Sequence, residues 1–262
     1  MAFIELHYHS DALKTAVTVN VLIPEKAKTL IGMDGKETEN YKTLYLLHGL
    51  SDDQTIWMRR TSIERYAASY GICVIMPFAG RSFYLNQKNG EKYYTYIAEE
   101  LPARMKEFFG CSTKREDMFI AGLSMGGYGA LKIALKEDGK FSAAAGLSSV
   151  ADIKTEMFKE HIQGLIGKEN YLSKDEDLFE LIREKENQPQ KPRLYMWCGT
   201  EDFLYADNIR LKEHIQKFDY DYTYKESSGV HSWDFWDVQI QDVLEWMFAE
   251  KIEISCIINE EN

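Results

Sequence analysis

The sequence contains few cysteines, and they are far apart. The four residues are Cys73, Cys111, Cys198 and Cys256, and no two of them lie within thirty residues of each other. This spacing excludes the paired CxxC arrangement that is typical of zinc sites and dithiol redox centres. Three of the four lie in or beside apolar segments, so we expect reduced thiols that are mostly buried.

Long apolar runs are also missing from the chain. No run approaches the roughly 20 residues that are needed to span a bilayer. The amino terminus reads Met-Ala-Phe-Ile-Glu-Leu-His, and it lacks the basic start and apolar core of a secretory signal peptide. The sequence therefore predicts a cytoplasmic protein with no membrane partner.

Basic residues are fewer than acidic residues. Lys and Arg number 31 against 42 Asp and Glu, which gives a net charge of −11. An acidic chain repels phosphate groups, which argues against nucleic acid or anionic membranes as partners. The 262 residues are 45% hydrophobic and 28% charged, which fits one globular domain over residues 1–262.

Short apolar segments predict a set of strands. The amino-terminal segment and residues 17–23 are predicted strands, because apolar residues alternate along 17–23 with the period of a half-buried strand. Continuous apolar runs follow at 44–47, 72–76, 118–121 and 194–198, as is typical of strands buried on both faces of a sheet. The polar segment 25–42 predicts a turn or hairpin link.

Helical segments lie between these runs. Apolar residues recur at helical spacing in residues 57–70, 93–109, 125–137, 205–218 and 232–249. We expect Leu101-Pro102 to kink or split the second of these helices. Alternating strands and helices predict an α/β fold with a mostly parallel central sheet and helices on both faces. Residues 151–192 break the alternation and are interpreted as a small helical insertion over the sheet edge.

The most specific motif is Gly-Leu-Ser-Met-Gly at residues 122–126, which fits G-x-S-x-G. It follows an apolar strand and opens a predicted helix, which is the context of a nucleophilic serine on a sharp turn. Ser124 is the candidate nucleophile, and Gly122 and Gly126 leave room for neighbouring chains. The alternative is a glycine-rich turn with an incidental serine.

A serine on such a turn needs a later histidine, with an acidic residue between them in the chain. Three of the six histidines precede Ser124 and have the wrong order, namely His7, His9 and His48. His161 lies in the insertion and His214 lies within a helical segment. His231 follows a strand-like stretch and precedes a helix, so it is the candidate general base.

The acidic partner is expected in the turn after the strand that ends at Cys198. Asp202 occupies this turn, and Glu201 and Asp207 are the alternatives. Its role would be to hold His231 in the required tautomer and to stabilise the imidazolium that forms.

Two backbone N–H groups are needed to stabilise a developing oxyanion. Met125, directly after the nucleophile, supplies one candidate. Leu50 supplies the other, because it lies in the loop that follows an early strand. His48 is expected to support this loop by hydrogen bonds rather than to take part in the reaction.

Four motifs occur together and in order: residues 48–50, 122–127, 199–202 and 229–233. With them the chain resembles the α/β-hydrolase esterase family that includes S-formylglutathione hydrolases, feruloyl and acetylxylan esterases, and mycolyltransferases. It is most similar to the bacterial tributyrin esterases, whose further marks are found at 44–49, 99–102, 120–124 and 198–205. The resemblance covers nearly the whole chain and is weakest over 151–192. It implies the α/β-hydrolase fold, with the family's triad and oxyanion residues at the positions derived above.

Aromatic residues around these motifs are candidates for the substrate pocket. By the resemblance, Trp57 stands near the acyl group, and Tyr84, Phe203, Tyr205 and Trp233 are further candidates. The alternative for each of them is packing in the core.

The sequence thus predicts a serine carboxylesterase that hydrolyses acetyl to butyryl esters through an acyl-enzyme. A small-molecule ester is the expected partner, a homo-oligomer is compatible with the sequence, and no cofactor or metal is expected. One alternative is a carbohydrate esterase that removes acetyl or feruloyl groups from plant-derived oligosaccharides. Others are an acyltransferase on the same triad and a binding module without catalysis.

One departure from the family pattern bears on the substrate. The S-formylglutathione hydrolases usually read Ser-Gly-Leu-Thr-Cys at the oxyanion loop, whereas residues 48–52 read His-Gly-Leu-Ser-Asp here. A dedicated glutathione thioesterase is therefore not expected.

Overall fold

The computed structural model describes residues 1–25, 41–88, 90–167 and 172–249. Most of the predicted link at 25–42 lies outside these ranges, and so does Cys256. The other three cysteines are unpaired and buried, which confirms the expected thiols at those positions. No helix among the described residues is long and apolar enough to cross a bilayer.

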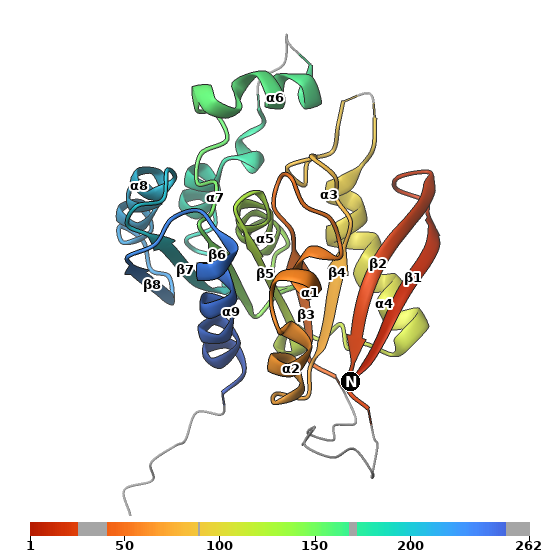
Figure 1. The fold of residues 1–262 in the computed structure, drawn as a ribbon. Coiled ribbons are helices and arrows are strands. Elements are labelled where there is room, and N and C mark those ends of the chain that lie inside the picture. The colour runs from red at the N-terminus through yellow and green to blue at the C-terminus, as the bar shows by residue number, and fades with distance from the viewer. Residues whose placement is uncertain (26–40, 89, 168–171, 250–262) are drawn as a thin grey trace, which may run out of the picture.

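The centre of the molecule is a twisted eight-stranded sheet (Figure 1). Its strands are β1 (Ala2–Ser10), β2 (Thr15–Ile23), β3 (Thr43–Leu47), β4 (Cys73–Pro77), β5 (Met118–Leu123), β6 (Ala143–Leu147), β7 (Arg193–Gly199) and β8 (Tyr222–Ser227). The order across the sheet is β1-β2-β4-β3-β5-β6-β7-β8. Only β2 pairs antiparallel, with β1 and β4, and the strands from β4 to β8 run parallel. The predicted α/β class with a mostly parallel sheet is confirmed.

The register of the central strands brings several loops together at one edge. Leu47 pairs with Gly122 and Leu123 pairs with Leu147, so β3, β5 and β6 end at the same level. Further along the sheet, Gly199 at the end of β7 pairs with Ser227. The loops after these strands therefore meet at the carboxyl edge of the sheet, where open α/β proteins bind their ligands.

The strand β6 was missed by the sequence analysis. It reads Ala-Ala-Ala-Gly-Leu and is buried along its whole length. Small residues fit here because the strand lies between β5 and β7 and is covered by helices on both faces. Ala and Gly carry no strand signal of their own, so the tertiary setting decides this element.

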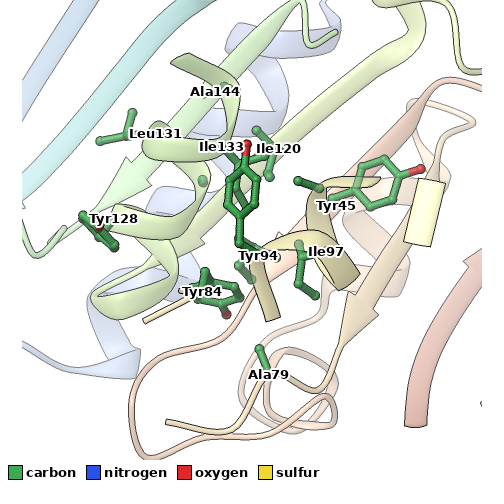
Figure 2. Close-up of a cluster of buried hydrophobic side chains, with 14 of the residues drawn as sticks. Tyr45, Ala79, Tyr84, Tyr94, Ile97, Ile120, Tyr128, Leu131, Ile133 and Ala144 are labelled. Atoms are coloured by element: carbon green, nitrogen blue, oxygen red, sulfur yellow. The ribbon is translucent and has the colours of Figure 1, made fainter. Parts of the chain in front are cut away.

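Helices cover both faces of the sheet. One face carries α3 (Tyr93–Thr95), the π-helical segment η1 (Tyr96–Glu100), α4 (Leu101–Phe109), α5 (Met125–Lys136), α7 (Leu178–Glu184) and α8 (Tyr205–Ile215). The other face carries α1 (Ile56–Arg60), α2 (Ile63–Ala68) and α9 (Trp233–Phe248). Figure 2 shows part of the first core, where Tyr94 and Ile97 face Ile120 of the sheet and Ile133 of α5.

The helix predicted at 57–70 is two helices in the structure, α1 and α2. The break comes at Thr61, whose hydroxyl donates a hydrogen bond to the Trp57 carbonyl at 2.6 Å. The same hydroxyl accepts a hydrogen bond from the Ile63 N–H at 3.1 Å. A threonine side chain that competes for backbone groups in this way ends one helix and begins the next.

The expected break at Leu101-Pro102 takes the form of a change in helix type. The segment η1 ends at Glu100 and α4 begins at Leu101. Because Pro102 has no N–H, the Ala98 carbonyl four residues earlier loses its helical donor. The Lys140 ammonium donates a hydrogen bond to that carbonyl instead.

The insertion at 151–192 contains helices but does not cover either edge strand of the sheet. Its elements are α6 (Glu156–Ile166), the short 3-10 helix η3 (Lys174–Glu176) and α7. The helix α7 packs against α5 and α8, whereas the edge strands are β1 and β8. The predicted position was therefore wrong, since the insertion joins two interior strands and lies over the helical layer.

An ion pair joins the insertion to α5. The Lys132 ammonium lies 2.6 Å from a Glu176 carboxylate oxygen and donates to the Tyr84 carbonyl at 2.8 Å. Its side chain is fully buried. Burial lowers the pKa of Lys132 to about 8, although the neighbouring Glu176 carboxylate acts in the opposite direction. The charge of Lys132 is thus held inside the protein by its acidic partner.

Substituting Glu176→Gln is expected to lower the free energy of unfolding by about 3–5 kcal/mol, because the buried Lys132 charge loses its counterion. Urea unfolding at pH 7 measures this change. The matched control is Glu156→Gln, which removes an exposed pair with Lys159 and should cost less than about 1 kcal/mol. Equal losses in the two variants would show that the buried pair contributes no more than a surface pair.

Candidate active site

Ser124 lies on a strained turn between β5 and α5. Its backbone angles are φ 54° and ψ −118°, a left-handed region that a residue with a side chain rarely adopts. The Ser124 N–H donates to the Leu147 carbonyl at 2.9 Å, which fixes the turn against β6. The side chain is therefore held at the carboxyl edge of the sheet.

The two glycines of the motif are required by close backbone contacts. A Cβ atom on Gly122 would collide with the backbone of Gly126. A Cβ atom on Gly126 would lie 2.5 Å from the Leu47 carbonyl oxygen and 2.7 Å from that of His48. The predicted reason for both glycines is confirmed, because neighbouring chain segments pass too close for any side chain.

The structure brings the candidate nucleophile, base and acid into one hydrogen-bonded row. His231 Nε2 lies 3.0 Å from Ser124 Oγ. On the other side of the ring, His231 Nδ1 lies 2.9 Å and 3.1 Å from the two oxygens of Asp202. A carboxylate at Nδ1 places the proton there and leaves Nε2 free to accept the serine proton.

The Asp202 carboxylate is buried and held by several donors. The Leu204 N–H donates to it at 2.8 Å, in addition to His231. Burial alone would raise the pKa of Asp202, but these hydrogen bonds and one from Ser148 lower it below its usual value. The group therefore stays ionised beside the imidazole.

Ser148 and Trp236 extend this row and were missed by the sequence analysis. The Trp236 Nε1–H donates to Ser148 Oγ at 3.0 Å, and the Trp236 ring meets the His231 ring edge to face at 4.8 Å. Ser148 directly follows β6 and has a left-handed φ of 45°. Its position at the carboxyl edge could have been predicted if β6 had been recognised as a strand.

The two alternative acids have other partners. The Glu201 carboxylate accepts hydrogen bonds from the Gly229 N–H at 2.6 Å and from the Ser228 hydroxyl at 3.3 Å. It thereby ties down the loop that carries His231. Asp207 pairs with Arg210 at 2.7 Å on the exposed side of α8.

The predicted oxyanion donors face the same cavity as Ser124. Leu50 and Met125 both line it. Met125 is the first residue of α5, so its N–H has no acceptor within the helix. In the described ranges, the Leu50 N–H donates no hydrogen bond. Both groups are thus free to bind an oxyanion.

His48 supports the oxyanion loop, as predicted. Its Nδ1–H donates to the Gly49 carbonyl at 2.7 Å, and its Nε2 accepts from the Ala79 N–H at 2.9 Å. Burial lowers the pKa of His48, which favours the neutral ring that this pair of hydrogen bonds requires.

The cavity at Ser124 has a volume of about 440 Å³. The insertion contributes an apolar part of the wall with Met157 and Phe158, next to Phe83. None of these three residues was predicted; for Met157 and Phe158 the reason is that the sequence does not indicate where the insertion packs. In the part of the chain that the structure describes, no three His, Cys, Asp or Glu side chains come together as metal ligands.

Of the aromatic pocket candidates, Phe203 and Trp233 line the cavity. Phe203 is 59% exposed and its ring lies 4.5 Å from that of His231. Tyr205 lies on α8, where its hydroxyl donates to Glu226 at 3.2 Å.

The placement of Trp57 and Tyr84 in the pocket was wrong, because both side chains are buried behind the oxyanion loop. Trp57 Nε1–H donates to the Leu47 carbonyl at 3.1 Å. The Tyr84 hydroxyl donates to the His48 carbonyl at 2.9 Å. They hold the loop backbone instead of contacting the cavity.

Comparison with known proteins agrees with this geometry. The sequence model of the esterase family matches residues 10–247. The chain belongs to the esterase family. This esterase is 31% identical to an acetyl esterase of Caldicellulosiruptor saccharolyticus, over 94% of this chain and 98% of that one. The predicted membership of the α/β-hydrolase esterases is confirmed.

Solved structures of similar proteins share the fold over almost the whole length. A fluorophosphonate-binding serine hydrolase of Staphylococcus aureus, FphF, is 36% identical, with a TM-score of 0.83 over 95% of this chain and 99% of that one. An S-formylglutathione hydrolase of the same species is 36% identical, with a TM-score of 0.80 over 94% and 98%. A ferulic acid esterase at 20% identity, with a TM-score of 0.77, shares the fold.

Substituting Glu201→Ala is expected to lower kcat for ester hydrolysis by about tenfold with little change in KM, because a loosened loop misplaces His231. Steady-state kinetics measures both constants. Glu201→Gln keeps an acceptor for the Gly229 N–H and should restore most of kcat. Exposed Glu213→Ala on α8 is the control. A loss in kcat that Glu201→Gln does not rescue would contradict a positioning role through this hydrogen bond.

Proposed function

We propose that this esterase hydrolyses esters of short acyl acids, from acetyl to butyryl, through an acyl-enzyme on Ser124. The observation that carries the proposal is the hydrogen-bonded row of Ser124, His231 and Asp202, which opens into a cavity of about 440 Å³. This volume lies toward the small end of the range for ligand pockets, roughly 300–1,000 Å³.

In the first half of the reaction, Ser124 Oγ attacks the ester carbonyl carbon while His231 Nε2 takes the serine proton. Negative charge then develops on the carbonyl oxygen, and the Leu50 and Met125 N–H groups stabilise it. His231 next gives the proton to the leaving alcohol, so that the carbon–oxygen bond breaks and the acyl group stays on Ser124.

In the second half, a water molecule attacks the acyl-enzyme. His231 takes one proton from the water and returns it to Ser124 Oγ as the acid departs. Asp202 stabilises the imidazolium that forms in each half and keeps the ring in one orientation. One cycle therefore consumes one ester and one water molecule and leaves the Ser124 hydroxyl free for the next turnover.

Two findings support a short acyl chain. The apolar wall of Phe83, Met157 and Phe158 offers a bounded surface beside the nucleophile, and the relative that is 31% identical is an acetyl esterase. We place the reaction in the cytoplasm, because unpaired buried cysteines are typical of a reducing compartment.

The test is a comparison of kcat/KM across acyl groups. The substrates are 4-nitrophenyl acetate, butyrate and octanoate, together with methyl ferulate and acetylated xylo-oligosaccharides, with Ser124→Ala as the blank. Acetate and butyrate should exceed octanoate by at least about tenfold and should exceed the ferulate and sugar esters. A dominant rate on ferulate or acetylated sugars would overturn the proposal in favour of a carbohydrate esterase. Transfer of the acyl group to added alcohols would instead indicate an acyltransferase.

A further inference from the structure

An acidic side chain that the mechanism does not use lines the active-site cavity. Asp52 follows Leu50 by two residues and lies in the wall of the same cavity as Ser124. Its backbone N–H donates to the Gly49 carbonyl at 3.2 Å, which folds the loop back and brings the side chain over it. A Cβ atom on Gly49 would lie 2.8 Å from the Asp52 carboxylate, so this glycine leaves room for the carboxylate.

The charge of Asp52 has little compensation. Among the residues that the structure describes, none forms an ion pair with it. Burial raises the pKa of Asp52, while the Gly49 N–H and the more distant Arg60 act in the opposite direction. The cavity therefore contains a partly desolvated negative charge, whose field acts on any ion that enters.

The position of Asp52 identifies which part of the substrate would meet this charge. His231 Nε2 must reach the leaving oxygen or sulfur in order to protonate it, so the leaving group lies on the His231 side of Ser124. Asp52 and His231 line the same cavity as Ser124, so a leaving group at His231 shares this cavity with the Asp52 carboxylate. Phe83 and Phe158 line the same cavity, with ring centroids 5.4 Å apart, and their apolar surface suits an acyl chain.

We infer that Asp52 is a specificity-determining residue that disfavours substrates with an anionic leaving group, so that the natural substrate is an ester of a neutral or cationic alcohol. This inference rests on the proposed esterase function and narrows its substrate class. A carboxylate close to the leaving group repels a second negative charge across a partly dry cavity, where screening by salt is weak. Thioesters of glutathione carry carboxylates on the leaving group and belong to the disfavoured class.

The test uses three acetyl thioesters whose leaving groups differ in charge. They are S-acetylthiocholine, which is cationic, S-acetylmercaptoethanol, which is neutral, and S-acetylthioglycolate, which is anionic. Release of the thiol is followed with a thiol reagent at pH 8, and kcat/KM is compared as ratios within each variant. The wild-type ratio of neutral to anionic substrate should be about 10 or more.

In Asp52→Asn this ratio should fall to within about threefold of unity, and the preference for the cationic substrate should fall with it. Asp53→Asn is the matched control. It removes the same charge from the neighbouring residue, whose carboxylate accepts hydrogen bonds from Thr55, and it should keep the wild-type ratio. Circular dichroism and thermal unfolding show whether both variants are folded.

The outcomes separate the inference from the function on which it rests. Equal ratios in the wild type and Asp52→Asn would overturn the role of Asp52, while serine-dependent hydrolysis would still support the esterase. A failure of the wild type to hydrolyse any of the three thioesters, or turnover in Ser124→Ala within about tenfold of the wild type, would overturn the proposed mechanism and the inference with it.

Discussion

Substituting Ser124→Ala is expected to lower kcat for short acyl esters by about 10⁶-fold, as in other serine hydrolases that lose their nucleophile. The reason is chemical, since among the described residues the Ser124 hydroxyl is the one hydrogen-bond partner of His231 Nε2, at 3.0 Å. The substitution removes one oxygen atom and leaves the Ser124 N–H bond to Leu147 in place. The measurement is single-turnover and steady-state hydrolysis of 4-nitrophenyl acetate.

The control for this variant is Ser69→Ala, which changes an exposed serine at the end of α2 and should keep the wild-type rate. Residual hydrolysis in Ser124→Ala is expected, because the oxyanion donors still bind the developing charge. A loss smaller than about tenfold would show that another group is the nucleophile.

Substituting Asp202→Asn is expected to lower kcat by about 10⁴-fold, with a much smaller effect on KM. The amide keeps the shape of the carboxylate but favours the wrong tautomer of His231 and no longer stabilises the imidazolium. Because Asp202 lies behind His231 and does not itself line the cavity, substrate binding should change little. Steady-state kinetics at pH 8 separates the two constants.

The same variant should also differ from the wild type in how its free energy of unfolding depends on pH. Hydrogen bonds hold the pKa of Asp202 below its usual value, so the ionised group stabilises the fold above the unfolded pKa of about 3.9. That contribution is lost as the pH falls through the lower, folded value. The wild type should therefore lose more stability than Asp202→Asn when urea unfolding is repeated at pH 5 and then at pH 3. An equal loss would show that the carboxylate is not selectively stabilised in the folded state.

The sequence was informative where topology or local sterics decide the structure. Parallel strands place their carboxyl ends at one edge, so residues after separate strands, such as Ser124 and Asp202, could be expected to meet. The glycines at 122 and 126 were predictable because the close approach is a property of the strand-to-helix turn itself.

Where packing between distant segments decides the structure, the sequence was not sufficient to predict it. Trp57 and Tyr84 are apolar rings with one polar atom, and the same side chain suits a pocket wall or a buried hydrogen bond to a loop carbonyl. The break at Thr61 depends on one hydroxyl that serves two backbone groups. The insertion carries no local signal that distinguishes packing on α5 from packing on the sheet edge.

The position of Ser148 shows how one missed element hides a functional residue. Its hydrogen bond to Asp202 depends on β6 ending at Leu147, level with β5. Since the sequence of β6 carries no strand signal, neither the strand nor the serine after it could be assigned in advance.

The most direct test of the account is the site of covalent labelling by a fluorophosphonate. An activated serine oxygen attacks the phosphorus and displaces fluoride, so each chain gains one phosphonyl group. Intact mass followed by peptide mapping should show a single adduct, on Ser124, in the wild type, slow labelling in Asp202→Asn and none in Ser124→Ala. An adduct on any other residue, or equal labelling of Ser124→Ala, would contradict the assignment of Ser124 as the nucleophile.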